Sequence, residues 1–470
     1  MSRSHERPPR WVVVSPRRRA AGTARFARPS SSFRTLTVAV LACIVLPAVI
    51  SPSSSSGAEL ELAVFQYGVP GEADLYRDIR DDFQRKNPGL TVRLSMLPWD
   101  GAFETLRRMV GPAGSAAAPD VVLVRNDWLP QLAGSLQPLN EAAESRARRE
   151  YCAGALNACY YGKRLYGIPL AARTQALYYR PDVLRQAKAK APENWGQLIQ
   201  VAAQTTSPPD MFGFGIPGAG PMGPSSLFLP MLWCTGARLD NDRGEVVFDV
   251  EALHVLSLLC ELALKRHGAQ PEVLSYTQAD LEALFAVGRL AMLVDGPWLA
   301  WYLDRDVPDL NYDIAPLPAG TRSASLVSVD LLAMPVNSRE PELAARLVRH
   351  LSQDRFLLAF AQLGALPAKR SVTRRDAIAK DKRLRPFARA LEEAESLPLA
   401  IWSQLEPALN RAIYDVLSGR KTPREAQRDF RPPGLRLASR LSQEQDSSLA
   451  PPNHEGAGGR VNRKTVREKR

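Results

Sequence analysis

The chain of 470 residues is long enough for two or three domains. Hydrophobic residues make up 45% of it and charged residues 23%, which excludes a chain that is disordered throughout and an integral membrane protein. The net charge of +12 lies at the two ends, because residues 59–432 carry 44 basic and 44 acidic side chains. A body without excess charge has no overall attraction to a polyanion, so we expect no nucleic-acid partner.

Residues 1–58 have the pattern of an export signal. Nine Arg and one Glu precede or flank the uncharged run LTVAVLACIVLPAVI at 36–50. A membrane-spanning helix needs about 20 apolar residues, so this shorter run favours a signal peptide. Small residues at Ser56 and Ala58 predict cleavage before Glu59 and a periplasmic or envelope-associated protein. An uncleaved N-terminal anchor and lipidation at Cys43 are the alternatives.

Four cysteines follow this segment, and they predict one local disulfide. The pair with the shortest separation is Cys152 and Cys159, which we expect to be bonded. Cys260 lies in an apolar helical pattern and is expected to be a buried thiol. The sequence has no Cys-x-x-Cys motif and its His residues are scattered, so we expect neither a metal site nor a cofactor.

The body opens with alternating strand and helix patterns. Strands are predicted at 61–68, 91–99 and 119–125, with helices at 75–86 and 101–110 between them. This β-α-β-α-β order predicts a parallel sheet covered by helices. Ligands bind such sheets beyond the carboxyl ends of the strands. Those ends carry Gln66-Tyr67, Pro98-Trp99-Asp100 and Arg125-Asn126-Asp127-Trp128.

The α/β pattern continues through the rest of the body. We predict a strand and helix over 176–187, helices at 195–205 and 227–235, and a strand near 211–216 between them. A short strand over 244–248 should precede a long helix that Asp249 caps and Gly268 ends. A helix, a strand and a turn then follow over 280–298.

Several segments, taken in order, resemble the carbohydrate-binding family of ABC-importer solute-binding proteins that includes maltose-binding protein. The matching segments are APDVVLVRNDWLPQLAGSLQPLNE, KRLYGIPLAARTQALYYRPDVL, LWCTGARLDNDRGEVVFD, LFAVGRLAMLVDGPW, YDIAPLPAG, LLAMPVNSREPELAARLVRHLS, LGALPAKRSV and IYDVLSGRKTPREAQRDF. Together they span roughly residues 60–430. The chain departs from the family pattern at Arg180-Pro181 and at Ser328-Val329-Asp330, and its 433–470 tail has no counterpart in the family.

The resemblance implies an α/β fold like that of type II periplasmic binding proteins, with two lobes, a multiply crossed hinge and a ligand cleft. By analogy, lobe one is 59–168 plus 296–336 and lobe two is 169–295 plus 337–432. Residues 1–58 would be the signal or anchor and 433–470 a disordered basic tail. A monomer would capture a small solute, foremost a carbohydrate, and pass it to the permease subunits of an ABC importer.

The expected ligand contacts are aromatic rings for sugar faces and polar groups for sugar hydroxyls. They are Tyr67, Trp99, Asp127, Trp128, Arg173, Trp233, Gly296, Trp298 and Asp330. Trp233 lies in an apolar helical run and is equally compatible with the core. Of Tyr178 and Tyr179, which alternate on a strand, one is expected in the core. Asp120 is expected to order a turn.

Three other functions are compatible with parts of the sequence. An exported glycan-acting enzyme would need two carboxylates, but no catalytic motif is present, so we expect no enzymatic activity. An exported receptor could bind a polyol or a glycerol phosphate, with or without an importer. A polyanion-binding protein would use the basic ends, which we interpret instead as export and tail segments.

Overall fold

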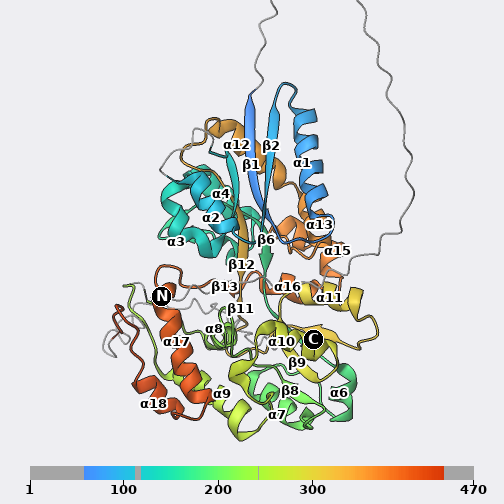
Figure 1. The fold of residues 1–470 in the computed structure, drawn as a ribbon, viewed down its shortest axis with the longest axis vertical. Helices are drawn as coiled ribbons and strands as arrows, with labels where there is room; N and C mark the ends of the chain where they lie inside the picture. Colours follow the sequence, from blue (N-terminus) through green and yellow to red (C-terminus); the bar gives the residue numbers. More distant parts are fainter. Residues whose placement is uncertain (1–57, 112–117, 242, 439–470) are drawn as a thin grey trace, which may run out of the picture. The chain divides into compact units, whose positions relative to one another are not determined.

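The computed structural model describes residues 58–111, 118–241 and 243–438 and is drawn in Figure 1. The expected signal with Cys43, and the tail beyond Ala438, lie outside the described residues. Within the described ranges, no helix is both long and apolar enough to cross a bilayer. Two compact units are present: unit one runs to Leu123 and includes Ala333–Gln353, and unit two comprises the rest. The expected lobe limits stay a prediction.

Unit one contains a parallel sheet, as the sequence predicts. Its elements are β1 (Glu59–Gln66), α1 (Glu72–Lys86), β2 (Thr91–Pro98), α2 (Ala102–Val110), β3 (Val121–Arg125, which continues into unit two) and α12 (Pro341–Leu351). Strand β1 pairs in parallel with β2 on one side and β3 on the other. The β1–β2 register places Gln66 opposite Pro98, so both strands end at the same edge of the sheet.

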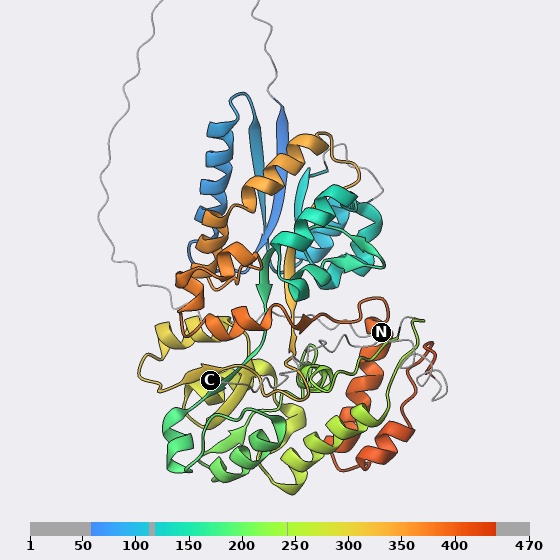
Figure 2. The same ribbon diagram turned by 180° about the vertical axis from the view of Figure 1, so that it is seen from behind.

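Helices α1 and α12 pack against each other in unit one. The buried residues Tyr76, Ile79 and Phe83 repeat at helical spacing along α1. Figure 2 shows α12 crossing one face of β1 and β2. The His350 ring of α12 lies 3.0 Å from the Asp82 carboxylate of α1, which joins the two helices by a polar contact as well.

Asp120 ties the late segment of unit one to its first strand. This buried carboxylate accepts hydrogen bonds from the Glu61 amide at 2.9 Å and the Ser338 hydroxyl at 2.8 Å. It also accepts from the backbone amides of Arg339 and Glu340, at 3.0 and 3.4 Å. Asp120 therefore satisfies donors from two distant stretches of chain, and it orders the turn before α12 as the sequence predicts.

Unit two is a mixed α/β structure with more than one sheet. Its strands are β4 (Tyr160–Tyr161), β5 (Arg164–Leu165), β6 (Ile168–Arg173), β7 (Ala176–Tyr179), β8 (Phe212–Phe214), β9 (Leu290–Asp295), β10 (Asp313–Ala315), β11 (Ser325–Leu326), β12 (Ser328–Ala333) and β13 (Ala394–Glu395). One sheet has the order β10-β7-β9-β8, β6 pairs with β12, and β11 pairs with β13.

Helices surround these strands. They are α3 (Leu129–Leu132), α4 (Glu141–Glu150), α5 (Ala153–Asn157), α6 (Pro181–Gln186), α7 (Trp195–Thr205), α8 (Ser225–Trp233), α9 (Val250–Cys260), α10 (Gln278–Ala286), α11 (Trp298–Asp306), α13 (Asp354–Gln362), α14 (Arg370–Thr373), α15 (Asp376–Ala379), α16 (Arg385–Ala390), α17 (Trp402–Leu417) and α18 (Pro423–Arg428). Short 3₁₀ turns are η1 (Asn126–Trp128), η2 (Ala133–Ser135) and η4 (Val273–Ser275), and η3 (Glu261–Lys265) is a π-helical turn.

Most local predictions for unit two are confirmed. Helix α7 has the predicted limits, and Asp249 caps α9 by accepting a hydrogen bond from the Glu251 amide. Tyr178 is fully buried while Tyr179 is half-buried, as their alternation on a strand predicts. The strand predicted over 244–248 is wrong, because Val246 makes isolated bridges to Asp240 and Leu437. The chain at 436–438 is thus hydrogen-bonded to Val246 beyond the expected boundary at 432.

The expected disulfide between Cys152 and Cys159 is absent from the structure. Both thiols are free and buried, as is that of Cys234. Cys152 is the residue before α5 and Cys159 follows its last turn. At 1.5 Å per residue the helical path separates their Cα atoms by about 10 Å, beyond the reach of a disulfide.

These thiols should be unreactive in the folded protein. Burial raises the pKa of the Cys152 thiol to about 12, and burial raises that of Cys159 further. Since the thiolate is the nucleophile, we expect slow alkylation by iodoacetamide at pH 8 and fast alkylation after unfolding in urea. Mass spectrometry of the alkylated protein measures both rates. An intact mass that rises on reduction would show that a disulfide had formed.

The Asp120 contacts predict a large loss of stability in Asp120→Ala. The substitution leaves several buried donors without an acceptor, so the free energy of unfolding should fall by about 2–4 kcal/mol. Urea unfolding followed by circular dichroism measures this change. Asp74→Ala removes an exposed carboxylate of α1 and should cost less than about 1 kcal/mol. Equal effects of the two substitutions would contradict the anchoring role of Asp120.

Candidate functional site

In unit one, Tyr67 and Trp99 form a stacked aromatic pair. Their ring centroids lie 4.9 Å apart, with 26° between the ring planes. Tyr67 follows the last residue of β1 and Trp99 follows the last residue of β2. The parallel register therefore brings these two predicted ligand residues together. Both residues are half-buried, so neither is enclosed in the core.

Two neighbouring residues fix this aromatic pair. Phe65, which is 1% exposed, lies edge-on to Tyr67 and Trp99, with centroids 5.5 and 5.7 Å away. Phe65 and Tyr67 are two positions apart, which is the spacing of side chains on one face of an extended chain. The buried Glu72 carboxylate accepts a hydrogen bond from the Tyr67 amide at 2.9 Å. This hydrogen bond fixes the turn after β1, and the fixed turn sets the position of the Tyr67 ring.

In unit two, Asp127 and Trp128 lie on the short turn η1. The Arg125 guanidinium donates two hydrogen bonds to Asp127, at 2.9 and 2.6 Å. The side-chain oxygen of the buried Asn126 accepts a hydrogen bond from the Val329 amide at 2.9 Å. This bond places η1 beside β12, the strand that carries Asp330.

Arg173 and Asp330 form a largely buried ion pair. The shortest distance between guanidinium and carboxylate is 2.8 Å, and the side chains are 17% and 3% exposed. They come from the antiparallel strands β6 and β12. Sequence reasoning placed both at the ligand site, and the structure shows in addition that they neutralise each other.

Trp233 is not brought together with the other predicted residues. It is the last residue of α8 and only 3% exposed. It belongs to the hydrophobic core of unit two, with Phe228, Leu229 and Leu232 of the same helix. Of the two roles compatible with its sequence pattern, the structure therefore supports the core.

Gly296 and Trp298 lie in contact at the junction of β9 and α11. A Cβ atom on Gly296 would lie 1.9 Å from the Trp298 ring, so this position requires glycine. The Trp298 indole nitrogen donates a hydrogen bond to Glu282 Oε1 of α10 at 3.0 Å. The buried Tyr178 hydroxyl donates to the Gly296 carbonyl at 2.7 Å and accepts from the Ala300 amide at 3.2 Å.

Sequence reasoning missed the residues that position the predicted contacts. Glu72 and Glu282 hydrogen-bond the candidates Tyr67 and Trp298, and Asn126 hydrogen-bonds Val329, the neighbour of Asp330. A sequence signal was available for Glu282, since it is a charged residue within the apolar helical pattern LEALFA. No local pattern links Asn126 to Val329, because these residues meet only through the fold.

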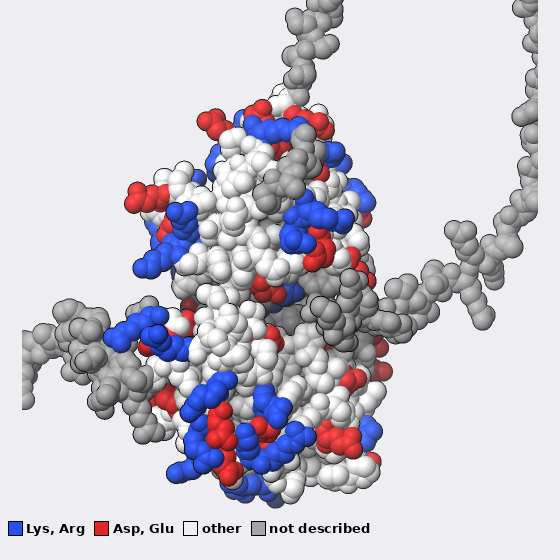
Figure 3. All heavy atoms as spheres, turned by 60° about the vertical axis from the view of Figure 1, so that its left-hand side comes forward, with Lys and Arg blue, Asp and Glu red and all other residues white. Residues whose placement is uncertain are grey.

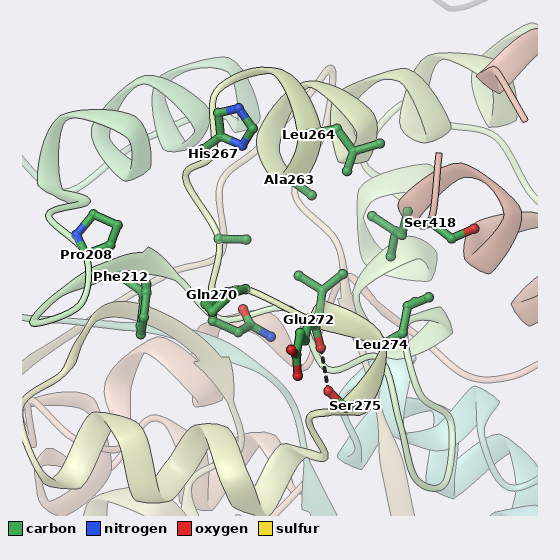
Figure 4. Close-up of a pocket in the computed structure, with 14 residues that line it drawn as sticks. Pro208, Phe212, Ala263, Leu264, His267, Gln270, Glu272, Leu274, Ser275 and Ser418 are labelled. Atoms are coloured by element: carbon green, nitrogen blue, oxygen red, sulfur yellow. Dashed lines mark hydrogen bonds between the residues drawn. The ribbon is translucent and has the colours of Figure 1, made fainter. Parts of the chain in front are cut away.

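A hollow of about 650 Å³ in unit two is separate from all nine predicted residues. Figure 4 shows it between η3, the 267–275 loop and the end of α17, with Phe212, Leu264 and Leu274 among its lining side chains. None of the predicted ligand residues lines it. Across the described ranges, His, Cys, Asp and Glu side chains form no group suited to hold a metal ion.

The surface charges are mixed in sign. On the face drawn in Figure 3, the Lys and Arg side chains lie next to Asp and Glu. Elsewhere in the described chain, exposed charges also pair, as Arg77 does with Asp74 and Lys380 with Asp376. The distribution agrees with the balanced charge of residues 59–432 and gives no support to a polyanion-binding role.

Comparison with protein families gives one match that covers most of the described chain. Residues 78–386 match the profile of the bacterial extracellular solute-binding proteins. The chain is 24% identical over 385 residues to a protein of Brucella abortus that is named as a binding protein without a ligand. That match covers 80% of this chain and 92% of the relative.

Two further similarities support the same fold. The galactooligosaccharide-binding protein of Bacillus subtilis is 22% identical, over 83% of this chain and 92% of its own length. The solved structure of the sugar-binding protein MalE from Xanthomonas citri matches with a TM-score of 0.69 and 23% identity. It covers 79% of this chain and 95% of that chain. The predicted α/β periplasmic-binding-protein fold is thereby confirmed.

The contact between Gly296 and Trp298 predicts that Gly296→Ala displaces the indole. The added methyl group forces the indole out of its packed position, so the free energy of unfolding should fall by about 1–3 kcal/mol. Urea unfolding measures this change. Gly134→Ala is the matched control, because a Cβ atom there has no neighbour within 4 Å. That control should change stability by less than about 0.5 kcal/mol. A Gly296→Ala protein as stable as the control would contradict the close packing described here.

Proposed function

The chain belongs to the family of bacterial extracellular solute-binding proteins, and we propose that it captures a sugar or oligosaccharide for an ABC importer. Membership of this family makes it a binding protein rather than an enzyme. In the proposal, the solute is held in a cleft between two lobes that close on it and is then delivered to a membrane permease. Closure follows when the solute makes more favourable contacts in the closed state than in the open one.

The observation that best supports a sugar ligand is the stacked pair Tyr67 and Trp99. A sugar ring has apolar C–H faces, and an aromatic plate removes those faces from water. Both rings are partly exposed at the strand ends, where ligands bind in parallel α/β sheets. The proposed contacts are Tyr67, Trp99, Asp127, Trp128, Arg173, Gly296, Trp298 and Asp330.

The ion pair of Arg173 and Asp330 favours an uncharged solute. Arg173 is the predicted residue best suited to an anionic ligand, but Asp330 already balances its charge at 2.8 Å. An anion would have to compete with that buried carboxylate for the guanidinium. The paired groups can still offer hydrogen bonds to hydroxyls, as a sugar requires.

The names of similar proteins agree with this choice of solute. A relative of comparable length is named a galactooligosaccharide-binding protein, and a similar structure is named a sugar-binding protein. Identity to both is below 25%, so the particular sugar is open. Polyols and glycerol phosphates are the competing solutes, and the location outside the cytoplasmic membrane is part of the proposal.

A thermal-shift screen tests the proposed function. We expect at least one mono- or oligosaccharide, in a set that includes maltose, maltotriose and galactooligosaccharides, to raise the Tm by several degrees. At 100 times Kd, a ligand that binds only the native state adds about 2.7 kcal/mol of stability. A rise with a polyol or glycerol phosphate, and none with any saccharide, would overturn the carbohydrate proposal.

Trp99→Ala should remove about half or more of that stabilisation. Losing an aromatic plate should lower the affinity about tenfold or more, measured by isothermal titration calorimetry with the saccharide that raises the Tm. Tyr161→Ala removes a half-buried ring from the β4–β5 hairpin and serves as the control. Equal affinities of the wild type and Trp99→Ala would exclude Trp99 from the ligand site.

A further inference from the structure

The Trp298 indole is held on two sides by named contacts. Its nitrogen donates to Glu282 Oε1 at 3.0 Å, and its ring lies against Gly296 so closely that a Cβ atom could not fit. Trp298 is partly exposed, whereas Gly296 is buried. The orientation of the exposed part of the ring therefore depends on where the Glu282 carboxyl group is held.

A second carboxyl group, that of Asp295, holds Glu282. Asp295 is 2% exposed and ends β9. It accepts hydrogen bonds from the Gly296 amide at 2.7 Å and the Gln278 side chain at 2.9 Å. Gln278 and Glu282 lie one turn apart on α10, so the hydrogen bond from Gln278 to Asp295 also brings the Glu282 carboxyl group toward that of Asp295. Two ionised carboxylates near each other in a buried place repel, so a proton held by one of them is favoured.

The surroundings favour a bound proton on this pair. Burial raises the pKa of Glu282, and burial with the nearby Glu282 charge raises that of Asp295 well above its ordinary value. Within the described ranges, no Lys, Arg or His forms an ion pair with either group.

Two tyrosines lie near this pair, and Asp304, Asp313 and Arg383 lie near the second of them. Burial raises the pKa of Tyr178 well above its ordinary value, so its hydroxyl stays neutral beside Gly296. Tyr312 stacks on Tyr178 at 6.0 Å and donates to Asp304, and its pKa is raised as well. Neither tyrosine therefore changes its charge in the pH range in which a carboxyl pair loses its proton.

We propose that Glu282 is a positioning residue for Trp298, and that Glu282 and Asp295 share one proton that keeps the indole oriented toward a ligand. This inference rests on the proposed function, because it takes Trp298 as a ligand contact. When the proton is lost, both carboxyl groups are negatively charged and lie near each other. Their repulsion separates α10 from the end of β9, and Trp298 loses its fixed acceptor.

The first test needs no ligand. In ¹⁵N-tryptophan-labelled protein, the indole signal absent from Trp298→Phe identifies Trp298. We expect that signal to move in Glu282→Leu and less in Glu282→Gln, whose amide oxygen still accepts the indole proton. Glu342→Gln, at an exposed position of α12, is the control and should leave it in place. A Trp298 signal unchanged in Glu282→Leu would overturn the proposal.

The second test follows pH. The Trp298 signal of the wild type should move as rising pH removes the shared proton, and Asp295→Asn should abolish this movement because an amide donates without titrating. The raised pKa values also mean that the native pair binds more protons than the unfolded chain above about pH 4. The stability of Asp295→Asn relative to wild type should therefore increase with pH. A pH-independent Trp298 signal in the wild type would overturn the shared proton.

The third test uses the saccharide that raises the Tm most, with maltotriose as the first probe. Glu282→Leu should lower its affinity about tenfold, and Glu282→Gln by less than about threefold. If no solute binds, the proposed function fails while the indole signal still tests the positioning. If a saccharide binds equally to wild type and Glu282→Leu, although the signal has moved, Glu282 does not position Trp298 for a ligand and the inference fails.

Discussion

Unit one depends on the buried carboxylate of Asp120. Its two oxygens accept four hydrogen bonds, from β1 and from the turn that precedes α12. Without this acceptor, the segment 333–353 would return to the first strand with unsatisfied amides. The sheet anchored in this way determines where the two aromatic rings lie. Since β1 and β2 are parallel and end in register, the residues that follow them, Tyr67 and Trp99, meet at one edge.

The sequence was sufficient where local pattern decides structure. Apolar runs separated by amphipathic helices predicted the parallel sheet of unit one, and Trp195–Thr205 forms the helix that its periodicity indicates. It was insufficient where distant segments meet. Val246 looked like part of a strand, but its partners are Asp240 and the far Leu437. The spacing of Cys152 and Cys159 suggested a bond, while the helix between them keeps the thiols apart.

For the candidate site, the sequence indicated residue types and strand ends but not partners. Arg173 and Asp330 are 157 positions apart, and only the pairing of β6 with β12 makes them an ion pair. Trp233 lies on a helix that is buried at every position except Ser226, so periodicity could not distinguish a core role from a binding role. Glu282 reaches Trp298 because α10 packs on β9, a contact that no motif records.

The buried thiols have a consequence for how this chain matures. Outside the cytoplasm the surroundings favour disulfides, and exported proteins with paired cysteines depend on enzymes that form and correct them. Here Cys152, Cys159 and Cys234 are enclosed as protonated thiols. If folding encloses these thiols before an oxidant reaches them, the folded protein does not depend on the enzymes that form and correct disulfides. If the chain is exported as proposed, a core that closes before oxidants reach these thiols gives the native thiol form.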